Sequence, residues 1–226
     1  MTEQNHQASL PAYPILVVMG APGVGKGTQA RLLAEKTGLP QISTGDILRE
    51  MARADSPLGH EIRLIQAAGR LVSDEILAKV IRVRTSADDC RNGYILDGCP
   101  RTLTQSRMLE ILAREQGQTI RVIKLNVPLT ALMQRLTGRR TCTQCGEIYN
   151  IYLKPPAQAN VCDRDGAALS HRSDDREETV LTRVTTYESA TKPLTEYYEQ
   201  SGRLVKINAD RDVDQVFADL LDAAKG

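Results

Sequence analysis

The amino-acid sequence predicts an α/β fold in which helices cover a mostly parallel β-sheet. Short apolar runs that suit buried strands alternate along the 226 residues with longer amphipathic stretches that suit helices. Hydrophobic residues make up 41% of the chain, with one Phe and no Trp, so the sequence predicts a packed and mainly aliphatic core. A chain of this length holds one sizeable domain or a core with small inserts.

Four apolar runs are expected to form strands of the sheet. Each is short, rich in Val, Ile and Leu, and bounded by glycine, proline or polar residues. Strands that are separated by helices form βαβ units, which pair in parallel. The four runs are YPILVVMG (13–20), GYILDG (93–98), IRVIKLNVP (120–128) and RLVKINA (203–209).

The stretches between these runs have the apolar periodicity of helices. Gly38 suits the end of the first helix, Ser43 or Thr44 the N-cap of the second, and Pro57 and Gly69 the start and end of the third. The expected helices span 25–38, 43–54, 57–70, 73–87, 102–117, 129–140, 175–202 with a bend near Pro193, and 213–225.

Two segments fit the sheet poorly and are predicted to be inserts. Residues 43–73 are helical in pattern throughout, whereas residues 138–175 are irregular, with Cys, Gly, Pro and Asn along their length. The other three segments, 1–42, 74–137 and 176–226, are expected to form the core.

The charge and hydropathy of the chain argue against several classes of partner. The formal net charge of +1 gives no basis for general nucleic-acid or membrane binding. No apolar run approaches the ~20 residues that a membrane span needs. The polar start MTEQNHQASLPAYP lacks the basic and apolar regions of a secretory signal and is expected to be a loose extension. We therefore expect a soluble, cytoplasmic protein.

A glycine-rich loop follows the first apolar run and precedes the first expected helix. Gly20 to Lys26 match the pattern G-x-x-x-x-G-K, whose glycines let backbone N–H groups turn around an anion. The next helix points its positive N-terminus at the same place, and Lys26 adds a mobile charge for the outer phosphates of a nucleoside triphosphate. Gly27 stands where Ser or Thr is common, and Thr28 follows. The plain alternative is a glycine-rich turn with a surface lysine.

Asp97 is a candidate for the metal that accompanies such a triphosphate. It ends the apolar run YILD, at the edge where ligands gather in parallel sheets. There its carboxylate can hold the Mg²⁺ shell through water, because Mg²⁺ gives up water reluctantly. An N-cap or turn aspartate is the alternative on position alone.

The cysteine pattern predicts a metal site in the second insert. Cys142-x₂-Cys145 and Cys162-x₂-Asp165 form two knuckles that can converge on one tetrahedral Zn²⁺. The odd total of five cysteines argues against a disulfide framework. The metal would staple residues 138–175, which are too few to build a core of their own. Free thiols or a redox CxxC pair are the alternatives.

Five motif blocks resemble, in order and approximate spacing, those of the adenylate kinases within the nucleoside monophosphate kinases. They are GAPGVGKGTQ, STGDILR, DGCPRT with Gln105 three residues on, LTGRR and RSDDREET. The resemblance runs from about Ile15 to the C-terminus, and the family's GKGT replaces the commoner GKS or GKT. It implies a P-loop three-layer α/β/α fold with a five-stranded parallel sheet, a helical NMP-binding insert at 43–73 and a long, zinc-containing lid at 138–175.

The resemblance also implies an activity and its residues: Mg²⁺-dependent phosphoryl transfer, ATP + AMP ⇌ 2 ADP, by a monomer whose ligands are these nucleotides. The implied catalytic residues are Lys26, Asp97, Arg101, Arg139, Arg172 and Arg183. The implied ATP-binding residues are Gly23, Val24, Gly25, Lys26, Gly27, Thr28, Arg135, Arg139, Ile148, Tyr149 and Arg211. The implied AMP-binding residues are Thr44, Arg49, Arg70, Leu71, Val72, Gly98, Cys99, Pro100, Arg101, Gln105, Arg172 and Arg183. Some members carry a Cys₃Asp zinc site in the lid, which Cys142, Cys145, Cys162 and Asp165 match.

The arginines have a physical reason to be there. Two polyanions repel each other and the transferred group carries charge, so the reaction needs cations and no general base. Planar guanidinium groups suit phosphate oxygens better than ammonium groups do. By resemblance, Arg49 and Arg101 hold the acceptor phosphate, and Arg139, Arg172 and Arg183 surround the transferred group.

Two other interpretations stay open. Thr44 and Gln105 favour AMP, yet pocket residues outside the motifs can suit another monophosphate such as UMP or CMP. A P-loop switch or zinc-knuckle nucleic-acid-binding module without transfer activity is the alternative from a different class, and the near-neutral charge argues against it. Cys99 departs from the family's usual Phe, which leaves the packing beside the acceptor site open.

Overall fold

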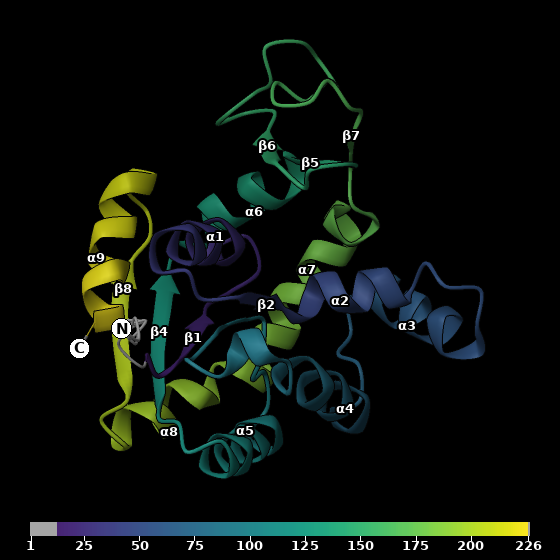
Figure 1. Cartoon of the computed structure of the whole chain (residues 1–226). Helices are drawn as coiled ribbons and strands as arrows, with labels where there is room; N and C mark the ends of the chain where they lie inside the picture. The colour runs from purple at the N-terminus through teal and green to yellow at the C-terminus, as the bar shows by residue number, and fades with distance from the viewer. Residues whose placement is uncertain (1–12, 226) are drawn as a thin grey trace, which may run out of the picture.

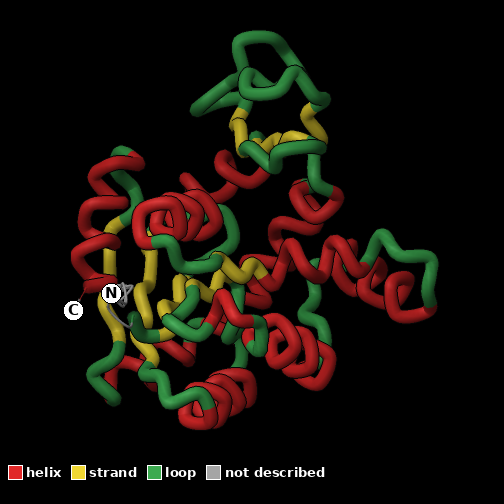
Figure 2. The backbone as a smooth tube through the Cα atoms, viewed as in Figure 1, coloured by secondary structure: helices red, strands yellow, loops and turns green. Residues whose placement is uncertain are grey.

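The central element is a five-stranded, fully parallel sheet that lies between two layers of helices (Figures 1 and 2). A computed structural model describes residues 13–225, so the expected N-terminal extension lies outside the described residues. The strand order is β2-β3-β1-β4-β8. The strands are β1 (Ile15–Met19), β2 (Gln41–Ser43), β3 (Ile95–Asp97), β4 (Ile120–Asn126) and β8 (Leu204–Asn208).

The parallel register brings the carboxyl ends of three strands together. Val18 of β1 and Ser43 of β2 both pair with Asp97 of β3. The loops that follow these strands therefore begin at one edge of the sheet, where ligands bind in parallel sheets. The strand β2 was not among the expected strands, because three residues after a proline carry too little apolar pattern to show.

Strand β1 divides the core into two, because its side chains alternate between the two faces of the sheet. Ile15 and Val17 belong to the cluster with Leu77 of helix α4 (Asp74–Thr85) and Leu109 of helix α5 (Leu103–Glu115). Leu16 and Val18 belong to the cluster on the other face, which is covered by helices α1 (Lys26–Thr37), α6 (Leu129–Thr137) and α9 (Val213–Lys225). All five residues of β1 are buried, as the apolar run predicts.

The helices of the core follow the expected segments closely. They are α1 (Lys26–Thr37), α4 (Asp74–Thr85), α5 (Leu103–Glu115), α6 (Leu129–Thr137), α7 (Glu177–Thr186), α8 (Pro193–Gln200) and α9 (Val213–Lys225). The long helix expected over 175–202 is interrupted by a π-helical turn at Tyr187–Thr191, just before the bend predicted at Pro193. Within residues 13–225, no helix is long and apolar enough to cross a membrane.

Residues 43–73 form two helices that project from the sheet, α2 (Thr44–Met51) and α3 (Pro57–Ala67). Ser43 is the N-cap of α2, because its side chain accepts a hydrogen bond from Asp46 N at 3.3 Å. Pro57 stands in the first turn of α3, where its missing N–H costs nothing.

Residues 138–175 are not irregular throughout, so the expectation of an irregular block was wrong for part of this segment. They contain a three-stranded antiparallel sheet of β6 (Ile148–Asn150), β5 (Arg139–Cys142) and β7 (Leu169–Ser170). Helix α6 ends at Thr137, so the helix expected to reach Arg140 also stops early. Strands of two to four residues between turns give no period that a sequence can display.

Candidate active site

The loop between β1 and α1 is shaped to receive an anion. Gly25 precedes α1 with φ of 104°, a left-handed conformation that favours glycine, and it makes no side-chain cap bond. Because Gly25 has no side chain, it cannot cap the first N–H groups of α1, and these groups stay open to a ligand. The helix dipole adds positive charge at the same point. Phosphate is the ligand that such a helix start binds.

The contacts of Gly27 give a reason why glycine stands where Ser or Thr is common. A Cβ atom at this position would lie 3.3 Å from Oδ2 of Asp97, so a side chain would crowd the carboxylate. Asp97 is 8% exposed at the end of β3, and burial raises its pKa while the charge of Lys26 opposes that rise. The hydroxyl of Thr44 donates to the backbone oxygen of Asp97 at 3.2 Å.

The side chain of Lys26 folds back over the glycine-rich loop that precedes it. Its Nζ donates to the backbone oxygens of Gly20 at 2.9 Å and Ala21 at 3.0 Å. The pKa of Lys26 is lowered to about 7, mainly by burial; the charge of Asp97 opposes this shift, and nearby arginines contribute to it. The cations around Lys26 outnumber its one anionic neighbour, and a bound phosphate would supply further negative charge.

Asp175 joins two of the predicted catalytic arginines, and the sequence analysis did not assign it. Its carboxylate accepts from Nε and Nη2 of Arg139 at 2.7 and 2.6 Å, and from Nη1 of Arg183 at 2.6 Å. Asp175 is fully buried, and although burial raises its pKa, the two arginines hold that pKa below its ordinary value. The acidic pair inside RSDDREET was the signal for it.

Arg172 and Arg49 bring further positive charge to the same region. Nε of Arg172 donates to the Thr141 hydroxyl at 3.2 Å, and Nη2 of Arg49 donates to Asp46 at 2.5 Å. Burial, together with the charges of Arg139 and Arg49, lowers the pKa of Arg172 to about 10. A guanidinium group whose pKa is lowered by burial and by neighbouring guanidinium groups lacks enough anionic partners, which suits a polyanionic ligand.

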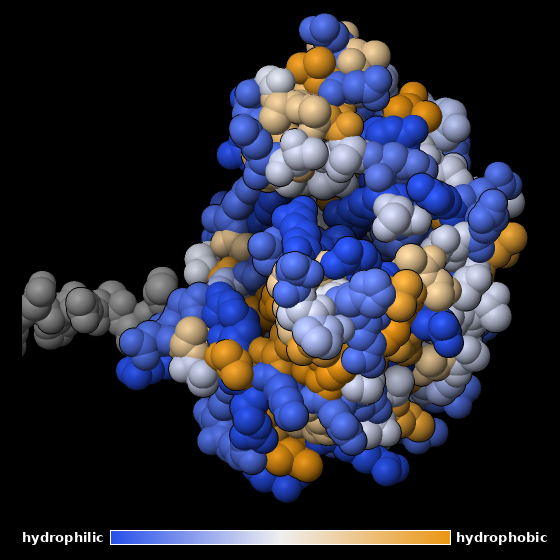
Figure 3. Space-filling view, turned by 90° about the vertical axis from the view of Figure 1, so that its right-hand side faces the viewer, coloured by the Kyte–Doolittle hydropathy of each residue, from blue (hydrophilic) through white to orange (hydrophobic). Residues whose placement is uncertain are grey.

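Two open grooves meet at the carboxyl edge of the sheet. The first groove runs beside the glycine-rich loop and has about 550 Å³ of empty space, and the second groove lies under α2 and α3 and has about 630 Å³. Lys26, Cys99 and Pro100 line only the first groove. Five residues line both: Gly69, Leu71, Gly98, Arg101 and Arg183. Figure 3 shows hydrophilic residues gathered at the hollow beneath the lobe of residues 138–175.

The second groove brings together most of the predicted acceptor residues. These are Thr44, Arg49, Arg70, Leu71, Val72, Gly98, Arg101, Gln105 and Arg183. Arg101 is anchored by its Nε, which donates to Gly98 O at 2.7 Å, and burial and Arg183 lower its pKa. Gln105 is 4% exposed, so its amide must find hydrogen-bond partners within the protein.

Of the eleven predicted donor residues, Lys26 lines the first groove and the other ten lie outside the lining of both grooves. Arg135 contacts the loop backbone at Val24 O, 3.4 Å away, whereas Arg211 forms an ion pair with Asp219 of α9. Ile148 and Tyr149 belong to β6, and the buried Tyr149 ring belongs to the small core around Cys162. The Tyr149 side chain therefore packs in the core of residues 138–175, so a nucleotide could contact this residue only through its backbone.

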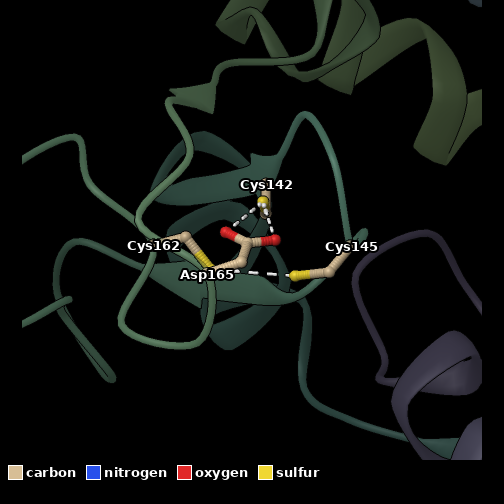
Figure 4. Close-up of side chains that lie close together, drawn as sticks. All are labelled: Cys142, Cys145, Cys162 and Asp165. Carbon is tan, nitrogen blue, oxygen red and sulfur yellow. Dashed lines mark hydrogen bonds between the residues drawn. The ribbon is translucent and has the colours of Figure 1, made fainter.

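The four predicted metal ligands converge in residues 138–175 (Figure 4). One donor atom from each of Cys142, Cys145, Cys162 and Asp165 lies within 4.8 Å of the others. The sulfurs of Cys145 and Cys162 are 3.7 Å apart, and Cys142 Sγ is 3.4 Å from both Asp165 oxygens. A tetrahedral zinc with Zn–S bonds of about 2.3 Å separates its sulfurs by about 3.8 Å, so the donor set fits this ion.

Glycine-rich loops of this form bind the phosphates of nucleoside triphosphates. A second groove lined by arginines, beside such a loop, can hold the acceptor to which a phosphoryl group is transferred. Fold and site together therefore define a P-loop kinase.

Comparison with known proteins agrees with this class and narrows it. The family model described as adenylate kinase matches residues 18–203. The adenylate kinase of Thermodesulfovibrio yellowstonii is 43% identical over 203 residues, which are 89% of this chain and 94% of that protein. Those of Bacillus cytotoxicus and Geobacillus sp. strain WCH70 are 44% identical over 91% and 93% of this chain and 95% and 98% of their own lengths. The chain belongs to the adenylate kinase family, whose members are phosphotransferases.

Proposed function

We propose that this protein catalyses the reversible, Mg²⁺-dependent reaction ATP + AMP ⇌ 2 ADP. The observation that carries the proposal is that the groove beside Lys26 and the groove beneath α2 and α3 meet at Arg101 and Arg183. A phosphoryl group held at that junction lies between a donor and an acceptor. Family membership supports the same reaction.

The donor side takes the triphosphate on the glycine-rich loop. The backbone from Gly23 to Thr28 surrounds the outer phosphates, and the charge of Lys26 neutralises them. Asp97 would hold the water shell of Mg²⁺, which would supply counter-charge to these phosphates. Arg135, whose guanidinium lies against the loop, flanks the donor base.

The acceptor side takes the monophosphate under the first insert. Arg49 and Arg101 hold its phosphate, and Thr44 and Gln105 contact its base, with the backbone of residues 70–72 along the pocket. No general base is needed, because alignment and charge stabilisation dominate phosphoryl transfer.

Residues 138–175 and 43–73 act as covers in this proposal. The first segment carries Arg139 and Arg172 and closes over ATP, and the second closes over AMP. Closure excludes the water that would otherwise hydrolyse ATP, and it brings the arginines into line around the transferred group. A structural Zn²⁺ on Cys142, Cys145, Cys162 and Asp165 holds the larger cover in shape. A monomeric state and a cytoplasmic location stay predictions.

A coupled assay for ADP tests the proposal. Purified protein with ATP, AMP and Mg²⁺ is expected to form two ADP per AMP consumed, with UMP and CMP at least about tenfold slower in kcat/KM. Faster turnover of UMP or CMP would instead make it a pyrimidine monophosphate kinase. No ADP formation, together with salt-sensitive binding of RNA, would favour the nucleic-acid-binding alternative.

A variant series locates the donor site within that assay. Lys26→Met is expected to lower kcat by at least about 100-fold while the circular dichroism spectrum stays unchanged, because a cation at the phosphates is lost. Lys36→Met, on the exposed last turn of the same helix, is the matched control and should keep full activity. Wild-type turnover in Lys26→Met would overturn the donor assignment.

A further inference from the structure

The side-chain amide of Gln105 is gripped from two sides by groups of opposite hydrogen-bonding character. Its Nε2 donates to Oδ1 of Asp74 at 2.6 Å, and its Oε1 accepts from the backbone N–H of Arg101 at 2.7 Å. An ionised carboxylate only accepts, and a backbone N–H only donates. The amide therefore has one orientation in which both hydrogen bonds form. If it turned over, Oε1 would face the Asp74 carboxylate and the Nε2 group would face the N–H of Arg101.

Asp74 is itself held in place. It is the first residue of α4, where the helix dipole favours a carboxylate. The hydroxyl of Thr102 lies 3.3 Å from both Asp74 oxygens, and the same hydroxyl accepts from Gln105 N at 3.1 Å as the N-cap of α5. Asp74, Thr102 and Gln105 thus form a closed network that ties the start of α4 to the start of α5.

Asp74 lies behind Gln105 relative to the acceptor pocket. Gln105 lines the second groove, whereas Asp74 lines a separate hollow between α4 and α5, on the other side of the amide. Asp74 therefore does not line the groove that receives the base, and any effect on the base passes through Gln105.

The fixed orientation determines which hydrogen bonds Gln105 can still offer. One N–H of its Nε2 remains for a ligand, and the second lone pair of its Oε1 faces only a weak donor, the Cys99 thiol with its Sγ at 3.9 Å, which a ligand can displace. The edge of adenine presents an acceptor at N1 and a donor at the 6-amino group. A 6-oxopurine reverses both, with a hydrogen on N1 and an oxygen at position 6. An amide that cannot turn over suits only one of these two patterns.

We propose that Asp74 is a positioning residue that sets the base specificity of the acceptor site by locking the Gln105 amide in the orientation that accepts adenine and rejects 6-oxopurines. The proposal rests on the assignment of AMP as acceptor. A buried polar group left unpaired by the wrong base costs enough to give strong discrimination, provided that the group cannot rotate to relieve it.

The ratio of kcat/KM for AMP to kcat/KM for IMP tests this. These two monophosphates differ only at N1 and position 6, and the ratio does not depend on how much of a preparation is folded. Asp74→Asn, which can both donate and accept, is expected to lower the ratio by about tenfold, mainly through a higher KM for AMP. Glu75→Gln, the same chemical change at the next, exposed residue, should leave the ratio unchanged.

A double-mutant cycle separates positioning from a general structural effect. In a Gln105→Leu background, Asp74→Asn should cause no further change in the ratio, because its effect requires the amide. An unchanged ratio in Asp74→Asn, or an equal fall with and without Gln105, would overturn the inference. A wild-type protein that forms no ADP from ATP and AMP would instead remove the proposed function on which it rests.

Discussion

Lys26 is buried close to several arginines, and this makes its protonation part of ligand binding. Burial lowers its pKa to about 7, with Asp97 opposing the shift and Arg101, Arg183 and Arg139 adding to it. A triphosphate beside it would raise that pKa again, because an opposite charge favours the ammonium form. Binding above neutral pH therefore requires the uptake of a proton, whereas below pH 7 the group is already charged.

This sign predicts that ATP affinity falls as the pH rises. Between pH 7.5 and pH 9, the Kd for ATP should increase by up to about tenfold per pH unit. Isothermal titration calorimetry in buffers of different ionisation enthalpy would show both the trend and the proton uptake. Lys26→Met should lose the dependence, and a flat profile in the wild-type protein would contradict the shifted pKa.

Asp175 predicts a stability effect at a single residue. Asp175→Asn should lower the free energy of unfolding by about 3 kcal/mol at pH 7, because two buried guanidinium groups lose their shared anion. Since the folded-state pKa of Asp175 lies below its ordinary value, the stabilisation is present above about pH 4 and is lost as the pH falls further. Urea unfolding at pH 7 and below pH 4 measures both.

The exposed pair of Asp88 and Arg91 provides the control for this experiment. Asp88→Asn removes a carboxylate of the same type from a surface ion pair, and it should cost less than about 1 kcal/mol. Equal losses in the two variants would show that burial of Asp175 contributes nothing.

At the scale of elements, the glycine-rich loop could be predicted from the sequence and the small sheet could not. A long apolar strand, a loop of fixed spacing and a helix are local patterns, so β1 and α1 appear where expected. Strands β5 and β6 form a hairpin too short to show a period, and β7 pairs with β5 from a distant part of the chain, as Thr141 with Ser170. Their sheet carries the predicted ligand Cys142 and packs Tyr149 beside it.

From the four predicted metal ligands we predict how residues 138–175 respond to removal of the metal by a chelator. We expect about one zinc per chain by elemental analysis, and a lower melting temperature after removal of zinc, because the buried cluster of Cys142, Tyr149, Cys162 and Leu169 is small. Cys142→Ser should lose the metal, whereas Cys90→Ser, at a buried cysteine outside the cluster, should keep it. A metal-free wild-type protein with an unchanged melting point would contradict the stapling role.

At the scale of the whole molecule, segments distant in sequence surround one ligand space. The second groove is lined by residues from the first insert, from β3 to α5, and by Asp174 and Arg183. An ion pair of 2.7 Å between Arg31 of α1 and Glu147 also links the larger insert to the core. Binding of ATP is therefore expected to order residues 138–175, and binding of AMP to order residues 43–73.

Hydrogen exchange monitored by mass spectrometry would show this ordering. ATP alone should slow exchange mainly in residues 138–175, whereas a bisubstrate dinucleotide that spans both grooves should slow it in residues 43–73 as well. The core helix α9, which lies on the opposite face from the second groove, serves as the internal reference. Protection of residues 43–73 by ATP alone would contradict separate covers for the two substrates.

Much of the site could be predicted because its residues stand in local motifs whose chemistry depends on spacing. Lys26, Asp97 and the four predicted metal ligands follow from such spacing, and the candidate arginines follow from the family's motif blocks. Asp175 and Asp74 were missed because an aspartate at a helix start has a plain local explanation. Their partners, Arg139 at one and Gln105 at the other, are 36 and 31 residues away.

Local patterns in the sequence were enough to predict four of the five parallel strands, most of the helices, the glycine-rich loop and the set of charged residues, since hydrophobic period and glycine spacing act over a few residues. Tertiary contacts were needed to form strand β2, the parallel register that brings three strand ends together, the small antiparallel sheet, and the orientation of the Gln105 amide. These depend on hydrogen bonds and burial between distant segments, whose free energy arises only when the chain is folded.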